Sequence, residues 1–192
     1  MLNKEYWDAK WRQGKSGWDL GHPSPPLMHY IRTSISPDSR ILLPGSGRGY
    51  EAGTAFREGF SHVYYNDISP YAVQEFRELF PDFPENQILL QDFYSIEEKF
   101  DYCLEQTSFC AQPPSRRSEY LYRIKEILHP DGVYAGVFFN VEFPFEGPPF
   151  GGTREEYETL FSKYFKIIKM EKCYNSVKPR IGSELFVIST PK

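Results

Sequence analysis

Short apolar runs alternate with longer amphipathic segments over most of the chain. A short apolar run bounded by turn residues predicts a buried strand, and apolar positions three and four apart predict a helix packed on a sheet. The predicted strands cover 41–44, 62–67, 87–91, 100–105 and 133–140, and the predicted helices cover 49–59, 70–80, 115–128 and 154–163, the third ending at HPDG (129–132). This alternation is typical of an α/β, three-layer fold with a largely parallel sheet and helices on both faces.

The two ends of the chain depart from this alternation. Strands 165–173 and 184–189 have no helix between them, so we expect them to pair as an antiparallel hairpin at one edge of the sheet. Two helices, 3–13 and 26–34, are predicted before the first strand, with a turn-rich connector at 21–27. The sequence shows no repeats, and we expect one domain over residues 1–192.

The first predicted strand runs into a loop with three closely spaced glycines, Gly45, Gly47 and Gly49. Glycines there let the backbone turn tightly and pass close to a ligand. The next strand ends at Asp67, about 20 residues further on, where a carboxylate can bind the two hydroxyls of a ribose. A role as a helix N-cap before Pro70 is the alternative for Asp67. Together the two features predict a site for a nucleoside-containing cofactor.

The spacing of the glycines narrows the choice of cofactor. A nicotinamide dinucleotide site would require G-x-G-x-x-G, whereas the loop reads G-x-G-x-G and Tyr50 occupies the next place. The chain is also too short for a full dinucleotide fold with a separate substrate domain. S-adenosylmethionine, which is smaller and has no pyrophosphate, fits both observations better.

Further candidate residues follow the third and fourth strands. Asp92 can accept a hydrogen bond from an adenine amino group while Phe93 packs beside the ring; a solvated loop acid next to a core aromatic is the alternative. Glu105 and Gln106 end the fourth strand, and ligands of open α/β sheets bind just outside the carboxyl ends of strands. Glu105 can face the cofactor's amino group or sulfonium there, or it can be an ordinary exposed acid.

The N-terminal segment, residues 1–36, is rich in tryptophan. Trp7 and Trp11 can form one helix face packed on the sheet, and together with Trp18 they can form a cap that excludes water and places indole faces near a sulfonium. Both interpretations can hold together. His22 lies in the same segment.

Two other places can contribute to a substrate pocket. The stiff loop GPPFGG (147–152), which contains Phe150, is either a pocket wall or a turn. Arg116 and Arg117 open a predicted helix and can attract an anionic substrate, or they can be a solvated basic pair.

Composition excludes several function classes. The net charge of −4 and pI of about 5.6 give no support to a nucleic-acid partner. No apolar run approaches membrane-spanning length, and the N-terminus lacks the apolar region of a signal peptide, so we expect a cytoplasmic protein, by default a monomer. The three cysteines have neither metal-ligand spacing nor the pattern of a disulfide framework, and no hydrolase or metalloenzyme motif is present, so we expect no metal.

In order along nearly the whole chain, several blocks resemble the thiopurine S-methyltransferase family and especially its plant-type halide and thiol methyltransferase branch. They are YWDAKWRQGKSGWDLGHPSPPL, ILLPGSGRGYEAG, FDYCLEQTSFCAQPPSRRSEY, LHPDGVY and FEGPPFGGTREEYETLF. The resemblance implies a seven-stranded class I methyltransferase fold with S-adenosylmethionine bound over the carboxyl edge of the sheet, under an N-terminal helical cap.

The resemblance also implies roles for individual residues. Positions that contact the cofactor in the family correspond here to Trp7, Trp11, Trp18, Gly45, Asp67, Asp92, Phe93 and Gln106. The chain departs from the branch at Ser46, where cysteine is usual, at Glu105, where aspartate is usual, and at Gln106, where an aromatic is usual. The residues after Gly152 also differ. These departures bear on which acceptor is methylated.

The expected reaction is an in-line displacement by a small soft nucleophile: a thiolate, a thiopurine, bisulfide, thiocyanate or a halide. Such anions need no strong base, so orientation and desolvation would supply most of the rate. For a neutral thiol, Glu105 and His22 are the candidate bases. The alternatives are methylation of another small acceptor, such as a tellurium or selenium oxyanion or a metabolite oxygen or nitrogen, a non-catalytic protein that binds the cofactor, and an oxidoreductase.

Overall fold

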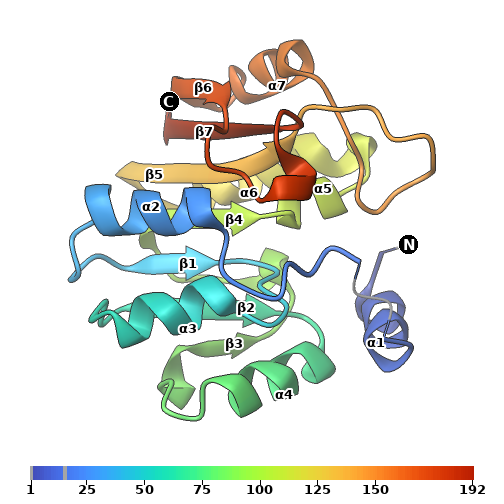
Figure 1. The fold of residues 1–192 in the computed structure, drawn as a ribbon. Coiled ribbons are helices and arrows are strands. Elements are labelled where there is room, and N and C mark those ends of the chain that lie inside the picture. Colours follow the sequence, from blue (N-terminus) through green and yellow to red (C-terminus); the bar gives the residue numbers. More distant parts are fainter. Residues whose placement is uncertain (1, 15–16) are drawn as a thin grey trace.

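The computed structural model describes residues 2–14 and 17–192, so Met1, Lys15 and Ser16 of the expected cap lie outside the described residues. One seven-stranded sheet has the order β3-β2-β1-β4-β5-β7-β6. Its strands are β1 (Ile41–Leu43), β2 (Val63–Asp67), β3 (Ile88–Leu90), β4 (Phe100–Gln106), β5 (Leu128–Phe139), β6 (Phe165–Lys172) and β7 (Glu184–Pro191). β3, β2, β1, β4 and β5 are parallel, whereas β7 pairs antiparallel with both β5 and β6. The expected sheet and its edge hairpin are confirmed (Figure 1).

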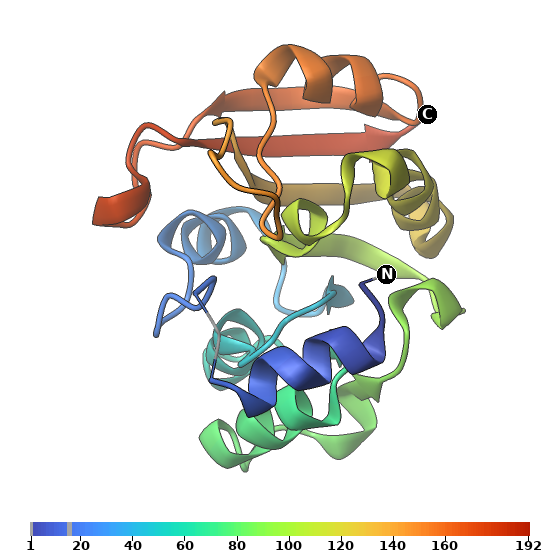
Figure 2. The same ribbon diagram turned by 90° about the vertical axis from the view of Figure 1, so that its right-hand side faces the viewer.

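Helices cover both faces of this sheet, as the apolar pattern predicts (Figures 1 and 2). One face packs against α2 (Pro25–Ser34), α3 (Tyr50–Arg57) and α4 (Pro70–Leu79) through residues such as Leu27, Ala55 and Phe76. The other face packs against α5 (Ser108–Ala111), α6 (Arg117–Ile127) and α7 (Arg154–Phe161) through residues such as Phe109 and Leu121. Apolar side chains that alternate along the central strands supply both halves of the core.

The N-terminal helix α1 (Lys4–Arg12) is placed differently from the other helices. It lies across the carboxyl ends of the strands, beside α4, as Figure 2 shows. Asn3 caps it by accepting a hydrogen bond from Tyr6 N, and the buried Asp8 accepts one from Ser69 Oγ at 2.6 Å. This second bond fixes α1 to the start of α4.

Two local predictions differ from the structure. β5 begins at Leu128, not at residue 133, so the HPDG segment lies within the strand rather than between a helix and a strand. Phe100 pairs with Leu128 and Tyr102 with Val133, so four residues of β5 bulge opposite Asp101 alone. The second difference is α5, which is only four residues long and was not predicted, because one turn is too short to show a helical period.

None of the helices in the described ranges is both long and apolar enough to span a bilayer. The order in which strands are added to the sheet reverses between β1 and β4, because the chain proceeds from β1 outward to β3 and then crosses back to β4, on the other side of β1. In open α/β sheets, ligands bind outside the carboxyl ends of the strands at this switch point. α1 covers that place.

Candidate active site

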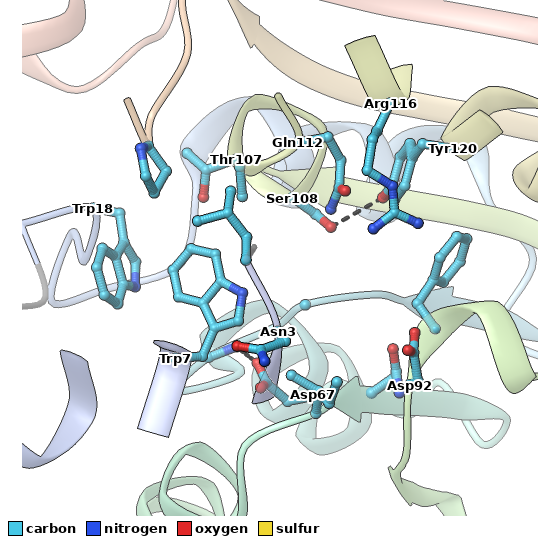
Figure 3. Close-up of a pocket in the computed structure, with 18 of the residues that line it drawn as sticks. Asn3, Trp7, Trp18, Asp67, Asp92, Thr107, Ser108, Gln112, Arg116 and Tyr120 are labelled. Carbon is cyan, nitrogen blue, oxygen red and sulfur yellow. Dashed lines mark hydrogen bonds between the residues drawn. The ribbon is translucent and has the colours of Figure 1, made fainter. Parts of the chain in front are cut away.

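The main cavity lies at the switch point and has three sides, shown in Figure 3. We call the loops after β1, β2 and β3 the strand-loop wall, the segment from α5 to the start of α6 with Pro148 and Pro149 the α5 wall, and the N-terminal residues the cap. The strand-loop wall contributes Gly45, Gly47, Asn66, Asp67, Ile68, Asp92, Phe93 and Tyr94. The α5 wall contributes Thr107, Ser108, Ala111, Gln112, Arg116, Tyr120, Pro148 and Pro149, and the cap contributes Leu2, Asn3, Trp7, Trp11 and Trp18.

The glycine loop uses backbone that other residues rarely adopt. Gly45 and Gly47 have φ of +57° and +56°. A Cβ on Gly47 would lie 3.4 Å from Trp11 Cζ2 and 4.0 Å from Trp18 Nε1, in the space between the loop and the cap. The backbone N–H of Gly47 donates to Asp67 Oδ2 at 2.9 Å. The loop thus leaves room for a ligand and is fixed to the end of β2.

Asp67 is buried and belongs to the strand-loop wall of the cavity. Its second oxygen, Oδ1, accepts from Ser69 N at 2.9 Å. Burial raises the pKa of Asp67 to about 6, although both backbone N–H donors act in the opposite direction. The alternative role of Asp67 was that of helix N-cap before Pro70. The N-cap of α4 is instead Ser69.

Asp92 and Phe93 line the end of the cavity beyond β3. Asp92 Oδ1 accepts from Tyr94 N at 3.0 Å and caps the short 3-10 helix Phe93–Ser95. Among the described residues, no backbone N–H donates to Asp92 Oδ2. The Phe93 ring lies 4.9 Å from the Tyr120 ring, so this part of the cavity has an aromatic surface beside a carboxylate oxygen.

The three cap tryptophans form one cluster over the cavity. Trp18 packs edge-on against both Trp7 (5.6 Å between ring centroids) and Trp11 (6.1 Å). Two contacts outside the cluster hold it in place: Asp19 forms an ion pair with Arg48 of the glycine loop, and Arg180 donates to Trp18 O at 2.9 Å. The three tryptophans are half-buried, line the cavity and belong to neither half of the core, so the structure supports the cap and not a helix face packed on the sheet.

Within the α5 wall, the sequence predicted only Arg116 and the loop 147–152, which contains Pro148 and Pro149. Thr107 has a φ of +71°, which is uncommon for a residue with a Cβ and turns the chain sharply from β4 into α5. Ser108 Oγ and the hydroxyl of Tyr120 share a hydrogen bond of 2.9 Å. Arg116 donates from Nε and Nη2 to the two carboxylate oxygens of Glu119, in a bidentate ion pair. Its guanidinium lies 4.9 Å from the centre of the Tyr94 ring. The loop 147–152 (GPPFGG), which we call the proline loop, closes this wall through Pro148 and Pro149.

Three predicted site residues near the fourth strand and the cap do not line the cavity. Gln106 Oε1 accepts from Ser24 Oγ at 2.6 Å, and its Nε2 donates to Glu184 at 3.3 Å, so its side chain braces the connector before α2. Glu105 is buried behind α5 rather than exposed at the strand end. His22 is exposed, with Nδ1 at 2.9 Å from Pro23 O. Neither candidate base therefore reaches the cavity.

The two adjacent arginines have different places. Arg116 lines the cavity, whereas Arg117 is buried beneath the proline loop, where Nη2 donates to Phe150 O at 3.1 Å and Gly151 O at 2.9 Å. Phe150 also lies outside the lining, which Pro148 and Pro149 provide. The expected substrate residues are thus corrected: Arg117 and Phe150 shape the wall, and their neighbours face the cavity.

Comparison with known proteins identifies the family. The family model for thiopurine S-methyltransferase (TPMT) matches residues 2–188. The chain belongs to the thiopurine S-methyltransferase family. It is 34% identical over 184 residues to probable thiol methyltransferase 2 of Arabidopsis thaliana, a match that covers 93% of this chain and 81% of that protein. It is 28% identical over 184 residues, with the same coverage, to thiocyanate methyltransferase 1 of Brassica oleracea.

Solved structures confirm the class I methyltransferase fold of this TPMT-family chain. The Burkholderia thailandensis 1,6-didemethyltoxoflavin-N1-methyltransferase, solved with 1,6-didemethyltoxoflavin and S-adenosylhomocysteine, superposes with a TM-score of 0.78 at 19% identity. The superposition covers 98% of this chain and 87% of the Burkholderia protein. The TPMT-family chain is therefore an S-adenosylmethionine-dependent methyltransferase of small nucleophiles, as expected.

The residues present fit this cofactor. Gly47 leaves open the space that a Cβ would fill below the cap, and the buried Asp67 carboxylate lies beside it. The aromatic surface of Phe93 and the carboxylate of Asp92 lie further along the same wall. The direct contacts of Trp7, Trp11, Trp18, Gly45, Gly47, Asp67, Asp92 and Phe93 with the cofactor stay predictions.

Proposed function

We propose that the acceptor is a small soft anion: a thiolate, a thiopurine anion, bisulfide, thiocyanate or a halide. The observation that supports this proposal is that the carboxylates of the described cavity lining, Asp67 and Asp92, both belong to the strand-loop wall and none belongs to the α5 wall. Among the described residues that line the cavity, none is His, Cys, Lys or Glu. Asp67 already accepts two backbone hydrogen bonds, and burial raises the pKa of Tyr94 to about 12 and the pKa of Tyr120 well above its ordinary value. An acceptor that arrives as an anion needs no base.

The charges of the cavity support the same proposal. S-adenosylmethionine, when bound, supplies an electrophilic methyl group on a positively charged sulfur. The strand-loop wall has two carboxylates, whereas the α5 wall has the guanidinium of Arg116. The Nη1 group of Arg116 takes no part in the ion pair with Glu119. We place the cofactor against the strand-loop wall and the acceptor anion toward the α5 wall.

The remaining contribution is orientation and the exclusion of water. The cap indoles and the proline loop enclose the cavity from two sides, and an anion that loses its hydration shell there is a stronger nucleophile. The plant relatives named for thiol and thiocyanate methylation support this substrate class. A cytoplasmic location and a monomeric state stay predictions.

The test combines binding and turnover on one sample. Calorimetry with S-adenosylmethionine and S-adenosylhomocysteine should give micromolar affinities. Headspace mass spectrometry with iodide, bisulfide, thiocyanate and an aromatic thiol should then detect methylated product, with Asp67→Ala and an enzyme-free sample as controls. Turnover of an oxyanion or a metabolite oxygen or nitrogen alone would replace the proposed acceptor class. Binding with no turnover on any acceptor would favour a non-catalytic protein.

A further inference from the structure

Glu105 has a buried carboxylate for which the proposed reaction has no use. Its side chain is 1% exposed at the end of β4, between the sheet and α5. Oε2 accepts a hydrogen bond from the backbone N–H of Phe109, and Oε1 accepts one from the hydroxyl of Tyr134. A buried carboxylate is costly unless it is hydrogen-bonded, so these two donors are what this one requires.

The neighbouring strand leaves space for this carboxylate. Glu105 lies opposite Gly136 of β5, and a Cβ on Gly136 would come within 2.9 Å of Glu105 Cγ. The side chain therefore runs across the face of β5 toward Tyr134. The missing Cβ of Gly136 thus leaves the space in which the Glu105 side chain reaches its two donors.

The hydrogen bond from Phe109 joins Glu105 to α5, the central element of the α5 wall. Thr107, with its positive φ, starts α5 directly over Glu105, so the carboxylate binds the first turn of this one-turn helix. Ser108 then packs against the glycine loop, because a Cβ on Gly45 would lie 2.9 Å from its Oγ. Cys110 O accepts from Phe150 N at 2.7 Å, which ties the proline loop to α5.

We propose that Glu105 is a positioning residue that sets the acceptor side of the active site by anchoring α5 to the sheet. It does not touch the cavity and is not the base for a neutral acceptor. Through α5 it places Thr107, Ser108 and Gln112, and through the bond between Cys110 and Phe150 it places the proline loop. This inference rests on the proposed function only in that the acceptor is expected at the α5 wall.

The charge state of Glu105 gives the proposal a distinctive signature. Burial raises the pKa of Glu105 to about 7. The groups that face it are Tyr134, Tyr120, Tyr157, Cys103, Cys110 and Arg117. Burial raises the pKa of each of these tyrosines and cysteines above its ordinary value, so Glu105 is the group in this set that titrates near neutrality.

Protonation would weaken the anchor without breaking it. A neutral carboxyl still accepts from Phe109 N and can donate to the Tyr134 oxygen, but an uncharged hydrogen bond is roughly half as strong as a charged one. We therefore expect kcat/KM for thiocyanate or iodide, which stay ionised throughout, to rise only a few-fold as pH increases through about 7. A general base would instead give a tenfold rise per pH unit below its pKa.

Three variants test the anchor. Glu105→Gln keeps one oxygen for Phe109 N–H and an amide that can donate to Tyr134, so it should match the low-pH wild-type rate and lose the inflection near pH 7. Glu105→Ala removes both acceptor atoms and should lower kcat/KM for the acceptor about 100-fold, with little change in affinity for S-adenosylhomocysteine. Tyr134→Phe keeps the bond to Phe109 and should have a smaller effect than Glu105→Ala.

A second measurement needs no acceptor, so it separates failure of this inference from failure of the proposed function. Hydrogen exchange of the amides in 106–113, with S-adenosylhomocysteine bound, should become faster in Glu105→Ala and stay close to wild type in Glu105→Gln. Unchanged exchange in Glu105→Ala would overturn the inference, whether or not an acceptor is found. If Glu105→Ala does not fold, Tyr134→Phe should still speed exchange in 106–113. Unchanged exchange in Tyr134→Phe would then overturn the inference. A Glu105→Gln variant as inactive as Glu105→Ala would show instead that the carboxylate takes part in the chemistry.

Discussion

The two walls of the active site are built in different ways. The strand-loop wall consists of residues at or just after the ends of consecutive strands, and its main contact joins Gly47 N to Asp67 at 2.9 Å. The α5 wall joins segments far apart in the sequence through two buried charged side chains. Glu105 holds α5 from below, and Arg117 holds the proline loop through Phe150 O and Gly151 O.

This difference separates binding of the cofactor from the choice of acceptor. The strand-loop wall requires only glycines with positive φ and a carboxylate at the end of the next strand. This arrangement can bind one cofactor whichever methyl acceptor is used. The α5 wall can change its shape and charge without altering that arrangement, because its own anchors hold it. We therefore expect substitutions in one wall to leave the function of the other largely intact.

The largest effect should come from Asp67→Ala. We predict that this carboxylate accepts hydrogen bonds from the two ribose hydroxyls, and hydrogen bonds to charged groups contribute about 1.5–3 kcal/mol each. Loss of two of them predicts a decrease in affinity for S-adenosylhomocysteine of about 100-fold or more, measured by calorimetry. Circular dichroism should show that the fold is retained.

Asp67→Asn is the matched control, because it keeps one acceptor oxygen and should lose less affinity than Asp67→Ala. Calorimetric affinity in Asp67→Ala equal to that of the wild type would remove the ribose assignment and leave the carboxylate a role in holding Gly47 N and Ser69 N alone.

Trp18→Ala tests the cap, which both walls share. Trp18 connects Trp7 and Trp11, and aromatic pairs of this kind are worth about 0.5–1.5 kcal/mol each beyond their buried area. Loss of both pairs predicts about tenfold weaker binding of S-adenosylhomocysteine, mainly through faster dissociation, which stopped-flow tryptophan fluorescence can follow. Trp18→Phe should retain most of the affinity. Equal dissociation rates in wild type and Trp18→Ala would mean that the cap does not cover the cofactor.

Arg116→Ala separates the walls most directly. A single partly exposed charge near an anion contributes on the order of 1 kcal/mol, so KM for thiocyanate should rise several-fold to about tenfold. The affinity for S-adenosylhomocysteine should not change. Arg117→Ala should lower the melting temperature instead, because it leaves two carbonyls of the proline loop without their buried donor. An equal loss of cofactor affinity in Arg116→Ala would place Arg116 at the cofactor.

The same contrast explains what the sequence could predict. Gly47 and Asp67 follow apolar runs directly, so strand ends and a spacing of about 20 residues locate them. Glu105 also follows an apolar run, but alternate residues of a strand point to opposite faces, and the turn at Thr107 covers the face that Glu105 occupies. Arg116 and Arg117 differ by one position at the start of a helix, and only the tertiary position of the proline loop decides which one faces the cavity.

The smallest effect should come from Ser46→Cys, although Ser46 lies between the two glycines of the strand-loop wall. Its hydroxyl donates to Leu43 O at 2.7 Å and its N–H to Asn66 O at 2.9 Å, whereas its side chain is absent from the described cavity lining. Cysteine keeps the size and the backbone contact but donates weakly, so unfolding free energy should fall by about 1 kcal/mol at most. Calorimetry should give an unchanged affinity for S-adenosylhomocysteine. A tenfold change would mean that the cofactor contacts the side chains of this loop, and not only its backbone and the space that Gly45 and Gly47 leave open.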